Sequence, residues 1–322
     1  MEKVKLLTAV PTLDQYKGCL LGLAMGDAFG APYEGGRLER FLWRIIGRTR
    51  HGQPRWTDDT QMTLDLAESI LYVGCLDQDD LASRFARSYH WSRGYGSGTA
   101  RVLKYIRKGR SWGVASKMVH PKGSYGNGAA MRASVLSLFF TDNLNELVNE
   151  TRRAAEVTHG HRLGIEGAVL IAVAAHKLLN RCTPLETVST IEKYCPSEPF
   201  QRRLQLIKKA LMYGAMPSPK KVARHLGNGM TAPTSCVSAL YIALVHLHTS
   251  FDAMMEFIVA CEGDVDTIGA MAGTLWGVYN GAYALPQKPL EARDVIEAKA
   301  VQMATVNSMH PSTPRPVQSE KP

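Results

Sequence analysis

Two short acidic segments, far apart in the chain, have the same construction. Residues 57–60 read Thr-Asp-Asp-Thr, residues 264–267 read Asp-Val-Asp-Thr, and each segment stands at the start of a predicted helix. Asp58 with Gln61 is typical of a capping box, and acidic side chains suit a helix N-terminus, so a cap explains either segment alone. If the segments meet, their four carboxylates repel one another, and some must be protonated or neutralised.

Divalent cations would neutralise such a cluster, since two of them balance four carboxylates. The segments offer only carboxylate and hydroxyl oxygens, which suit Mg²⁺ or Mn²⁺ better than Ca²⁺. Zinc sites normally include histidine or cysteine at short spacing, and neither accompanies these segments. Two metal ions can activate water and clamp a substrate, so we predict a hydrolase with a binuclear metal site.

Two rows of glycines suggest how the acidic segments meet. Glycines stand at positions 18, 22, 26 and 30, and again at 269, 273, 277 and 281. A spacing of four places each row on one face of a helix. Each glycine inside a helix costs roughly 0.5–1 kcal/mol relative to alanine, so we expect the two rows to pack closely against each other in return. Leucine at Gly22 or Gly273 is therefore predicted to destabilise the fold strongly.

Glycine loops and one histidine are candidates for ligand contacts. The loop at 123–132 runs into a likely helix, and a second glycine-rich loop spans 94–99. Exposed backbone N–H groups in such loops can cradle phosphates, although glycine spacing alone favours an ordinary flexible loop, and no Gly-Lys-Ser/Thr follows as in a P-loop. His159 and His161 do not share a helix face, which favours a polar ligand contact for His159 over a metal site.

Helical periodicity dominates the chain and predicts an all-α fold. Thr12 is expected to cap a helix that runs to about Gly30, residues 164–179 are predicted to form a buried helix, and the apolar pattern continues over 237–261. Alternating strand patterns are scarce. One catalytic domain is predicted over 10–303, followed by a disordered, polar, proline-bearing tail over 304–322.

Composition limits the classes of protein. The chain has 322 residues, of which 45% are hydrophobic, and a net charge of +9. A basic surface can attract phosphorylated ligands or nucleic acid, but the basic residues are scattered, which is equally typical of a solvated surface. Six cysteines without a Cys-x-x-Cys pair indicate reduced, mostly buried thiols in a cytoplasmic protein. We expect no signal peptide and no membrane span.

In combination these motifs resemble the ADP-ribosylglycohydrolase family, which includes the dinitrogenase-reductase-activating glycohydrolases and the ADP-ribosylhydrolases. The matching stretches follow the family's order over most of the chain: Gly26–Gly30 with Glu34, Trp56–Thr60, Gly123–Arg132, Thr158-His159 and Asp264–Thr267. Arg93-Gly94-Tyr95-Gly96 is most similar to the branch that hydrolyses serine-linked ADP-ribose and poly(ADP-ribose).

The resemblance implies a compact, single-domain, orthogonal helix bundle with two Mg²⁺ or Mn²⁺ ions. It implies catalytic roles for Glu34, Asp58 and Asp59. The metal ligands it implies are Thr57, Asp58, Asp59, Asp264, Asp266 and Thr267. The ADP-ribose contacts it implies are Gly94, Gly96, Gly123, Ser124, Tyr125, Gly126, Asn127 and His159.

The expected activity is hydrolysis of the bond between the anomeric ribose carbon of ADP-ribose and an acceptor. The expected partners are an ADP-ribosylated protein or nucleic acid and ADP-ribose itself, bound by a monomer. The segment between Glu34 and Thr57 is short and basic, and position 119 lacks an aromatic residue for stacking on adenine, so the acceptor stays open. The alternatives are a two-metal hydrolase of a phosphoester and a non-catalytic ADP-ribose-binding relative, and the intact acidic motifs argue against the latter.

Overall fold

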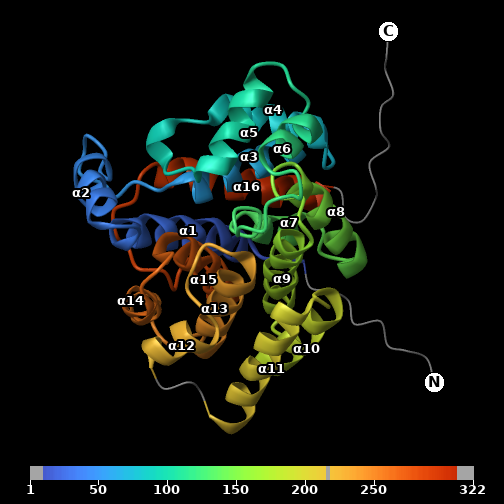
Figure 1. Ribbon diagram of the computed structural model, residues 1–322. Helices are drawn as coiled ribbons and strands as arrows, with labels where there is room; N and C mark the ends of the chain where they lie inside the picture. Colours follow the sequence, from blue (N-terminus) through green and yellow to red (C-terminus); the bar gives the residue numbers. More distant parts are fainter. Residues whose placement is uncertain (1–9, 215–217, 310–322) are drawn as a thin grey trace, which may run out of the picture.

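The structure is a computed structural model that describes residues 10–214 and 218–309. Within these ranges the chain forms sixteen α-helices and three 3-10 helices, with isolated bridges but no strand (Figure 1). The all-helical fold predicted from the periodicity is therefore confirmed. The helices are α1 (Leu13–Gly30), η1 (Ala31–Tyr33), α2 (Arg37–Ile46), α3 (Asp58–Val73), α4 (Gln78–Ser88), η2 (Trp91–Arg93), α5 (Ser97–Arg107), α6 (Trp112–Val119), η3 (Ala133–Val135), α7 (Leu136–Phe139), α8 (Leu144–Glu156), α9 (Arg162–Leu179), α10 (Pro184–Tyr194), α11 (Glu198–Tyr213), α12 (Pro219–His225), α13 (Ala232–Val245), α14 (Phe251–Cys261), α15 (Val265–Asn280) and α16 (Arg293–Met309).

The centre of the fold is the pair α1 and α15, which lie against each other along their glycine rows (Figure 1). A Cβ atom added to Gly269 would stand only 2.6 Å from the carbonyl oxygen of Gly26, and the pair Gly22 and Gly273 lies closer still. The obstacle is backbone on both sides, so no side chain fits between the helices. The close packing predicted from the glycine spacing is confirmed.

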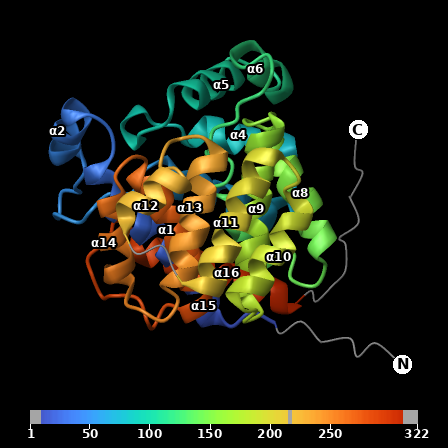
Figure 2. The same ribbon diagram turned by 60° about the horizontal axis from the view of Figure 1, so that its bottom comes forward.

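Other helices cover this central pair on several sides. α3 and α16 pack on α1, while α9 and α13 pack on α15. Figure 2 shows α9, α11 and α13 beside one another on the lower face of the molecule. α9 and α13 are buried along most of their length, as their apolar sequences predict, because each is enclosed by neighbouring helices.

Four of the six cysteines are buried and all six are free thiols.

The helix starts show where local sequence decides the structure. Thr12 caps α1 as predicted, and the structure adds a capping box in which the side chains of Thr12 and Gln15 each accept the other's backbone N–H. The capping box predicted for Asp58 and Gln61 is wrong, because Thr57 is the N-cap of α3 and its hydroxyl accepts the N–H of Asp59. Asp58 therefore lies in the first turn, where its carboxylate is not used as a cap.

The C-terminal helix is longer than the sequence indicates. α16 continues to Met309, so a disordered tail does not begin at Ala304; the rest of the predicted tail, 310–322, lies outside the described residues. Asn307 explains the extension, because its amide donates to the hydroxyl of Tyr16 on α1 at 2.7 Å. Among the described helices, none has the length and apolar character needed to cross a membrane.

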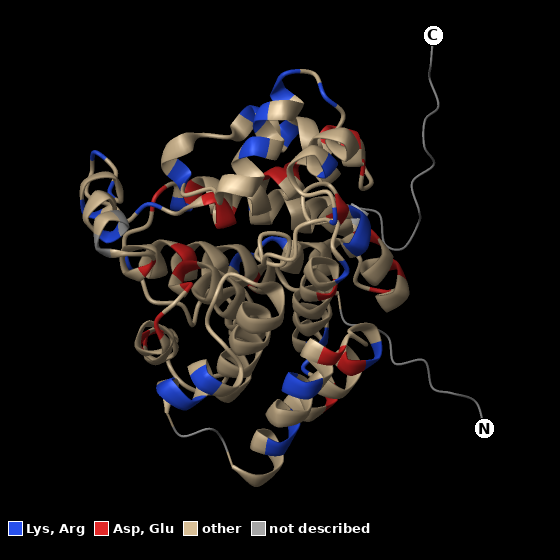
Figure 3. Cartoon of the chain, in the orientation of Figure 1, with Lys and Arg blue, Asp and Glu red and all other residues tan. Residues whose placement is uncertain are grey.

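α2 differs from the other helices in its exposure. It projects from the body beside α1 (Figure 1), and the side chains of Leu38, Phe41, Leu42 and Ile45 are between 48% and 70% exposed. Figure 3 shows basic positions on this helix and on α5, and acidic positions gathered between α1 and the start of α3. The acidic positions mark the candidate site.

Candidate active site

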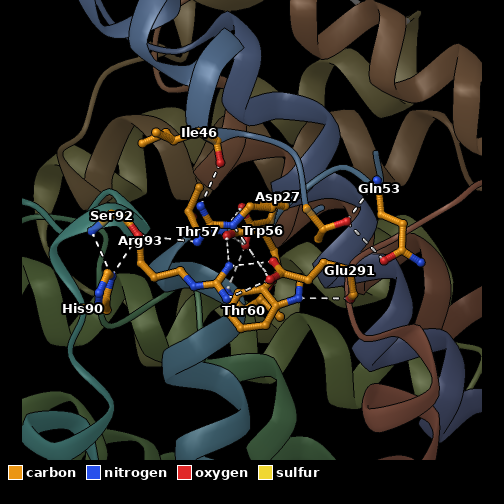
Figure 4. Close-up of polar contacts among 12 residues, drawn as sticks. Asp27, Ile46, Gln53, Trp56, Thr57, Thr60, His90, Ser92, Arg93 and Glu291 are labelled. Atoms are coloured by element: carbon orange, nitrogen blue, oxygen red, sulfur yellow. Dashed lines mark hydrogen bonds and ion pairs between the residues drawn. The ribbon is translucent and has the colours of Figure 1, made fainter. Parts of the chain in front are cut away.

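Asp27, in the last turns of α1, fixes the position of the first acidic segment. Its fully buried carboxylate accepts the backbone N–H groups of Thr57 at 2.9 Å and of Thr60 at 3.1 Å, and the Thr60 hydroxyl at 2.5 Å (Figure 4). These N–H groups belong to the start of α3, where helix geometry leaves them without intrahelical partners. Through Asp27, α1 thus fixes the position of the N-terminus of α3. Sequence reasoning did not assign Asp27 a role; the available signal was a single acidic residue in the otherwise apolar, glycine-containing second half of α1.

The two acidic segments come together as predicted. Carboxylate oxygens of Asp27, Asp59 and Asp266 lie within 4.8 Å of one another, and those of Glu34, Asp264 and Asp266 form a second such group. Asp266 belongs to both groups, so the two groups form one cluster. This acidic cluster is the meeting point of α1, α3 and α15.

The remaining predicted metal ligands border the acidic cluster. Thr57 and Thr267 are buried, and Asp58 is partly exposed in the first turn of α3. Gly94 lies over this turn, since an added Cβ would stand 3.8 Å from Oδ1 of Asp58. Gly94 has a positive φ of 81°, so the backbone conformation, and not a lack of space, favours glycine at this position.

A tight turn places Asp264. The residues before it, Glu262 and Gly263, both have positive φ, and a Cβ on Gly263 would collide with Asn228. The backbone carbonyl of Asn228 accepts the N–H of Asp264 at 2.8 Å. Asn127 of the glycine loop donates its side-chain amide to Oδ2 of Asp264 at 2.5 Å. The glycine loop is therefore joined directly to the acidic cluster.

Burial governs the electrostatics of the acidic cluster. It raises the pKa of Asp27 to about 6, and it raises the pKa values of Asp58, Asp59 and Asp266 well above the ordinary range, with neighbouring carboxylates adding to the effect. Burial also raises the pKa of Asp264, although hydrogen bonds from Asn127 and neighbouring groups oppose it. Within the described residues, no salt bridge pairs these five aspartates with a lysine or arginine.

The acidic cluster fits a hard divalent cation. Oδ2 of Asp59 and Oδ1 of Asp264 are buried, and neither has a hydrogen-bond partner within the described part of the chain. Buried carboxylate oxygens without partners are costly unless a proton or a cation neutralises them. The surrounding donors are carboxylates and threonine hydroxyls, the oxygen ligands that Mg²⁺ and Mn²⁺ prefer.

Arg93 and Glu291 form an ion pair, here called the clamp, that holds the segment leading into α3. Arg93 forms a bidentate ion pair with Glu291 at 2.6 and 3.0 Å and donates to the carbonyl of Trp56 at 2.8 Å (Figure 4). Its guanidinium also lies 3.5 Å from the centre of the Trp56 ring, whose N–H donates to the Glu291 carbonyl. The clamp fixes the residue next to Thr57 and so limits the movement of the first acidic segment.

The glycine loop takes its shape from the turn before α9. Gly123 has a positive φ of 79°, and a Cβ there would collide with the backbone of His161. The carbonyl of Ser124 accepts the N–H of His161, and the carbonyl of Tyr125 accepts the N–H of Ala232 at 3.0 Å. The Tyr125 side chain is 52% exposed, with its ring edge-on to His161 at 5.6 Å, so an aromatic surface stands open beside the loop.

His159 lies behind the same loop, where two glycines make room for its ring. An added Cβ on Gly126 or Gly128 would stand 3.4 or 3.0 Å from Nε2 of His159. The predicted contacts at 123–127 and His159 are therefore brought together. An added Cβ on Gly96 meets nothing within 4 Å, and the predicted contact of Gly96 with ADP-ribose stays a prediction.

Carboxylates gathered beside a glycine loop in a helical fold place the chain among the hydrolases, and comparison with known proteins specifies which kind. The chain belongs to the ADP-ribosylglycohydrolase family, whose model matches residues 8–312. It is thus a hydrolase of a glycosidic bond, and the family expected from the sequence is confirmed.

Individual relatives agree with this assignment. The chain is 30% identical to human ADP-ribosylhydrolase ARH3 over 324 residues, covering 87% of this chain and 89% of that protein. It is 26% identical to the ADP-ribosylarginine hydrolase Tri1 of Pseudomonas putida, covering 88% of this chain and 76% of that protein. A solved structure described as an ADP-ribosylglycohydrolase-related protein complex is similar with a TM-score of 0.67 at 30% identity, covering 91% and 98% of the two chains.

Proposed function

We propose that the protein is a divalent-metal-dependent hydrolase that releases ADP-ribose from a modified acceptor. The observation that carries the proposal is the acidic cluster with its two buried, unpartnered carboxylate oxygens, joined by Asn127 to a glycine loop. Such a cluster suits cations, and such a loop suits a diphosphate. The family assignment supplies the bond that is cleaved.

The residues proposed to hold two Mg²⁺ or Mn²⁺ ions are Thr57, Asp58, Asp59, Asp264, Asp266 and Thr267. When bound, such ions lower the pKa of water and hold substrate oxygens in place. Asp27 supports this set by holding the N–H groups of Thr57 and Thr60, and Asn127 supports it through Asp264. Supporting contacts of this kind orient ligand side chains.

Glu34 is the residue we assign to proton transfer at the scissile bond. It follows η1, is half-buried, and reaches the edge of the acidic cluster, where one of its carboxylate oxygens lies within 4.8 Å of a carboxylate oxygen of Asp266. Asp58 and Asp59 are assigned to accept protons from water. Departure of the acceptor leaves an oxocarbenium-like ribose, which a surrounding group of carboxylates stabilises.

The loop at 123–127 and His159 are proposed to bind the ADP-ribose, with Gly94 and Gly96 bordering the path to Asp58. The exposed ring of Tyr125 offers a stacking surface for the adenine. Acceptor choice is assigned to α2, which follows Glu34 directly and presents exposed arginines and apolar side chains to solvent. An ADP-ribosylated protein or nucleic acid is the expected partner there.

The deciding experiment measures free ADP-ribose from substrates ADP-ribosylated on serine, on arginine and on nucleic acid, each with Mg²⁺ or Mn²⁺ and with EDTA. Release from at least one substrate, abolished by EDTA, is expected. Absence of release from all three with metal present would overturn the proposal, and cleavage of a phosphoester instead would show a different two-metal hydrolase.

Variants give a second readout that does not depend on turnover. Asp58→Ala and Asp266→Ala should abolish activity and weaken Mn²⁺ binding measured by calorimetry. Asp252→Ala is the matched control, because Asp252 is a partly exposed aspartate at the start of α14, outside the acidic cluster, whose carboxylate pairs with Lys288. Full turnover in either cluster variant would show that the metal site is misassigned.

A further inference from the structure

Arg132 is a fully buried arginine beneath the glycine loop. Its side chain is 1% exposed and donates to the carbonyl of Gly128 and to the hydroxyl of Thr158, the latter at 2.9 Å, while the guanidinium lies 4.8 Å from the centre of the Phe85 ring. No salt bridge within 4.0 Å involves Arg132 among the described residues, although its charge interacts favourably with the nearby carboxylate of Asp58. A guanidinium that is buried without a direct ion pair is costly, which suggests that its hydrogen bonds have a role beyond packing.

Thr158 links Arg132 to His159 by a second hydrogen bond. An arginine side chain can only donate, so the Thr158 hydroxyl accepts from Arg132 and its own proton must find another acceptor. Nδ1 of His159 lies 2.8 Å away and is the acceptor that the structure provides within the described chain. Thr151, the buried threonine two turns earlier on α8, differs because its hydroxyl donates to the Leu147 carbonyl at 2.7 Å.

The direction of these two hydrogen bonds defines the state of the imidazole. If Nδ1 accepts from Thr158, the ring proton of neutral His159 must be on Nε2. Burial, followed by the nearby charges of Arg132 and His120, lowers the pKa of His159 to about 3, so the ring is neutral at physiological pH. Nε2 is the atom that lies against Gly126 and Gly128, on the side of the glycine loop.

We propose that Arg132 and Thr158 are positioning residues that hold His159 as the Nε2–H tautomer, so that the ring offers a fixed donor to a diphosphate oxygen of ADP-ribose. The ligand half of this inference rests on the proposed function; the tautomer half does not. In the opposite tautomer the buried Thr158 proton would have no acceptor, which disfavours that form by roughly ten- to hundredfold. The opposite tautomer would also present a lone pair to a phosphate oxygen, which is itself an acceptor.

Nitrogen NMR of the full chain tests the tautomer without any ligand. The protein is labelled with ¹⁵N-histidine, and His159→Gln assigns the resonances of this ring. The expected spectrum has an unprotonated Nδ1 and a protonated Nε2 that do not change between about pH 5.5 and pH 8. A protonated Nδ1 in the unmodified protein, or a ring that titrates across this range, would overturn the proposal.

Substitutions at Thr158 test the relay and its effect on binding. Thr158→Val removes the hydroxyl and should give a mixture of tautomers and an ADP-ribose affinity about ten- to hundredfold lower in the presence of Mg²⁺. Thr158→Ser keeps the hydroxyl and should restore both the single tautomer and the affinity. Thr151→Val is the matched control, which removes a buried hydroxyl of the same kind and should leave the His159 spectrum unchanged.

The outcomes separate this inference from the proposed function. A single Nε2–H tautomer that persists in Thr158→Val would overturn the relay even if ADP-ribose binds tightly. If the unmodified protein has the predicted Nε2–H tautomer and Thr158→Val loses it, the relay is supported. If the unmodified protein does not bind ADP-ribose, the proposed function and the role of His159 as a donor to the diphosphate are overturned.

Discussion

Alanine at Gly269 is the sharpest test of the close contact between α1 and α15. A Cβ at this position would stand 2.6 Å from the carbonyl oxygen of Gly26, whereas ordinary contact begins at 3.4 Å. The shortfall is 3.4 − 2.6 = 0.8 Å, and the obstacle is backbone, so the helices must separate. A gap of about 0.5–1 Å forfeits a quarter to a half of the dispersion energy of each contact along the pair.

The expected net effect combines two opposing contributions. Overpacking against backbone costs about 3 kcal/mol, and replacing a helical glycine by alanine returns about 0.5–1 kcal/mol, so we expect a loss of about 2–2.5 kcal/mol in the free energy of unfolding. Displacement of α15 also moves Asp266 away from Asp27 and Asp59, so Mn²⁺ affinity should fall in parallel.

Urea unfolding followed by circular dichroism measures the first effect, and calorimetry measures the second. Gly113→Ala in α6 is the matched control, because an added Cβ there meets nothing within 4 Å; it should stabilise the protein by about 0.5–1 kcal/mol. If Gly269→Ala unfolds at the same urea concentration as the wild type or a higher one, the reasoning about backbone contact fails.

Three further predictions concern the acidic cluster and its supports. The pKa of Asp27 is raised from 3.8 to about 6, so the stability that its protonated form contributes to the metal-free protein is complete below about pH 4 and is lost as the pH rises through 6. Mg²⁺ or Mn²⁺ should therefore stabilise the protein more as the pH rises. A metal-induced increase in thermal midpoint that becomes smaller from about pH 5 to pH 8 would contradict this prediction. Asp27→Asn should lower Mn²⁺ affinity about 10–100-fold in calorimetry, and unchanged affinity would remove its supporting role. Arg93→Lys should lower the free energy of unfolding in urea by about 1–3 kcal/mol, because lysine can form neither the bidentate ion pair with Glu291 nor the stacking contact on Trp56. A double-mutant cycle with Glu291→Gln that shows no coupling energy would refute the clamp.

The features of the fold and the site that could be predicted from the sequence are those marked by a repeated sequence pattern. Glycines at a spacing of four are visible without a structure because helix geometry turns the spacing into a face, and their cost implies close packing. The two acidic segments share a pattern, and their convergence follows from the helices that carry them. In both cases a local pattern contains the information that the fold then uses.

The features that sequence reasoning missed join single residues that are distant in the chain. Asp27 binds backbone N–H groups of α3, and Arg93 pairs with Glu291; neither partner is indicated by a local motif. The error at the start of α3 arose because Thr57 and Asp58 are adjacent and both residue types favour the N-cap position. Which of two adjacent residues caps the helix depends on the position of Asp27, and that position is a property of the fold.

The glycine contact also determines when the protein can fold during its synthesis. α1 leaves the ribosome early, but its partner α15 begins only after a further 264 − 30 = 234 residues. At about 5–20 residues per second, the nascent chain waits roughly 10–50 s with the glycine face of α1 unpartnered. A ribosome-bound chain that ends before Asp264 also lacks Asp264 and Asp266 of the acidic cluster. Hydrolase activity is therefore confined to chains that extend beyond Thr267, so the activity and the central helix contact appear together during synthesis.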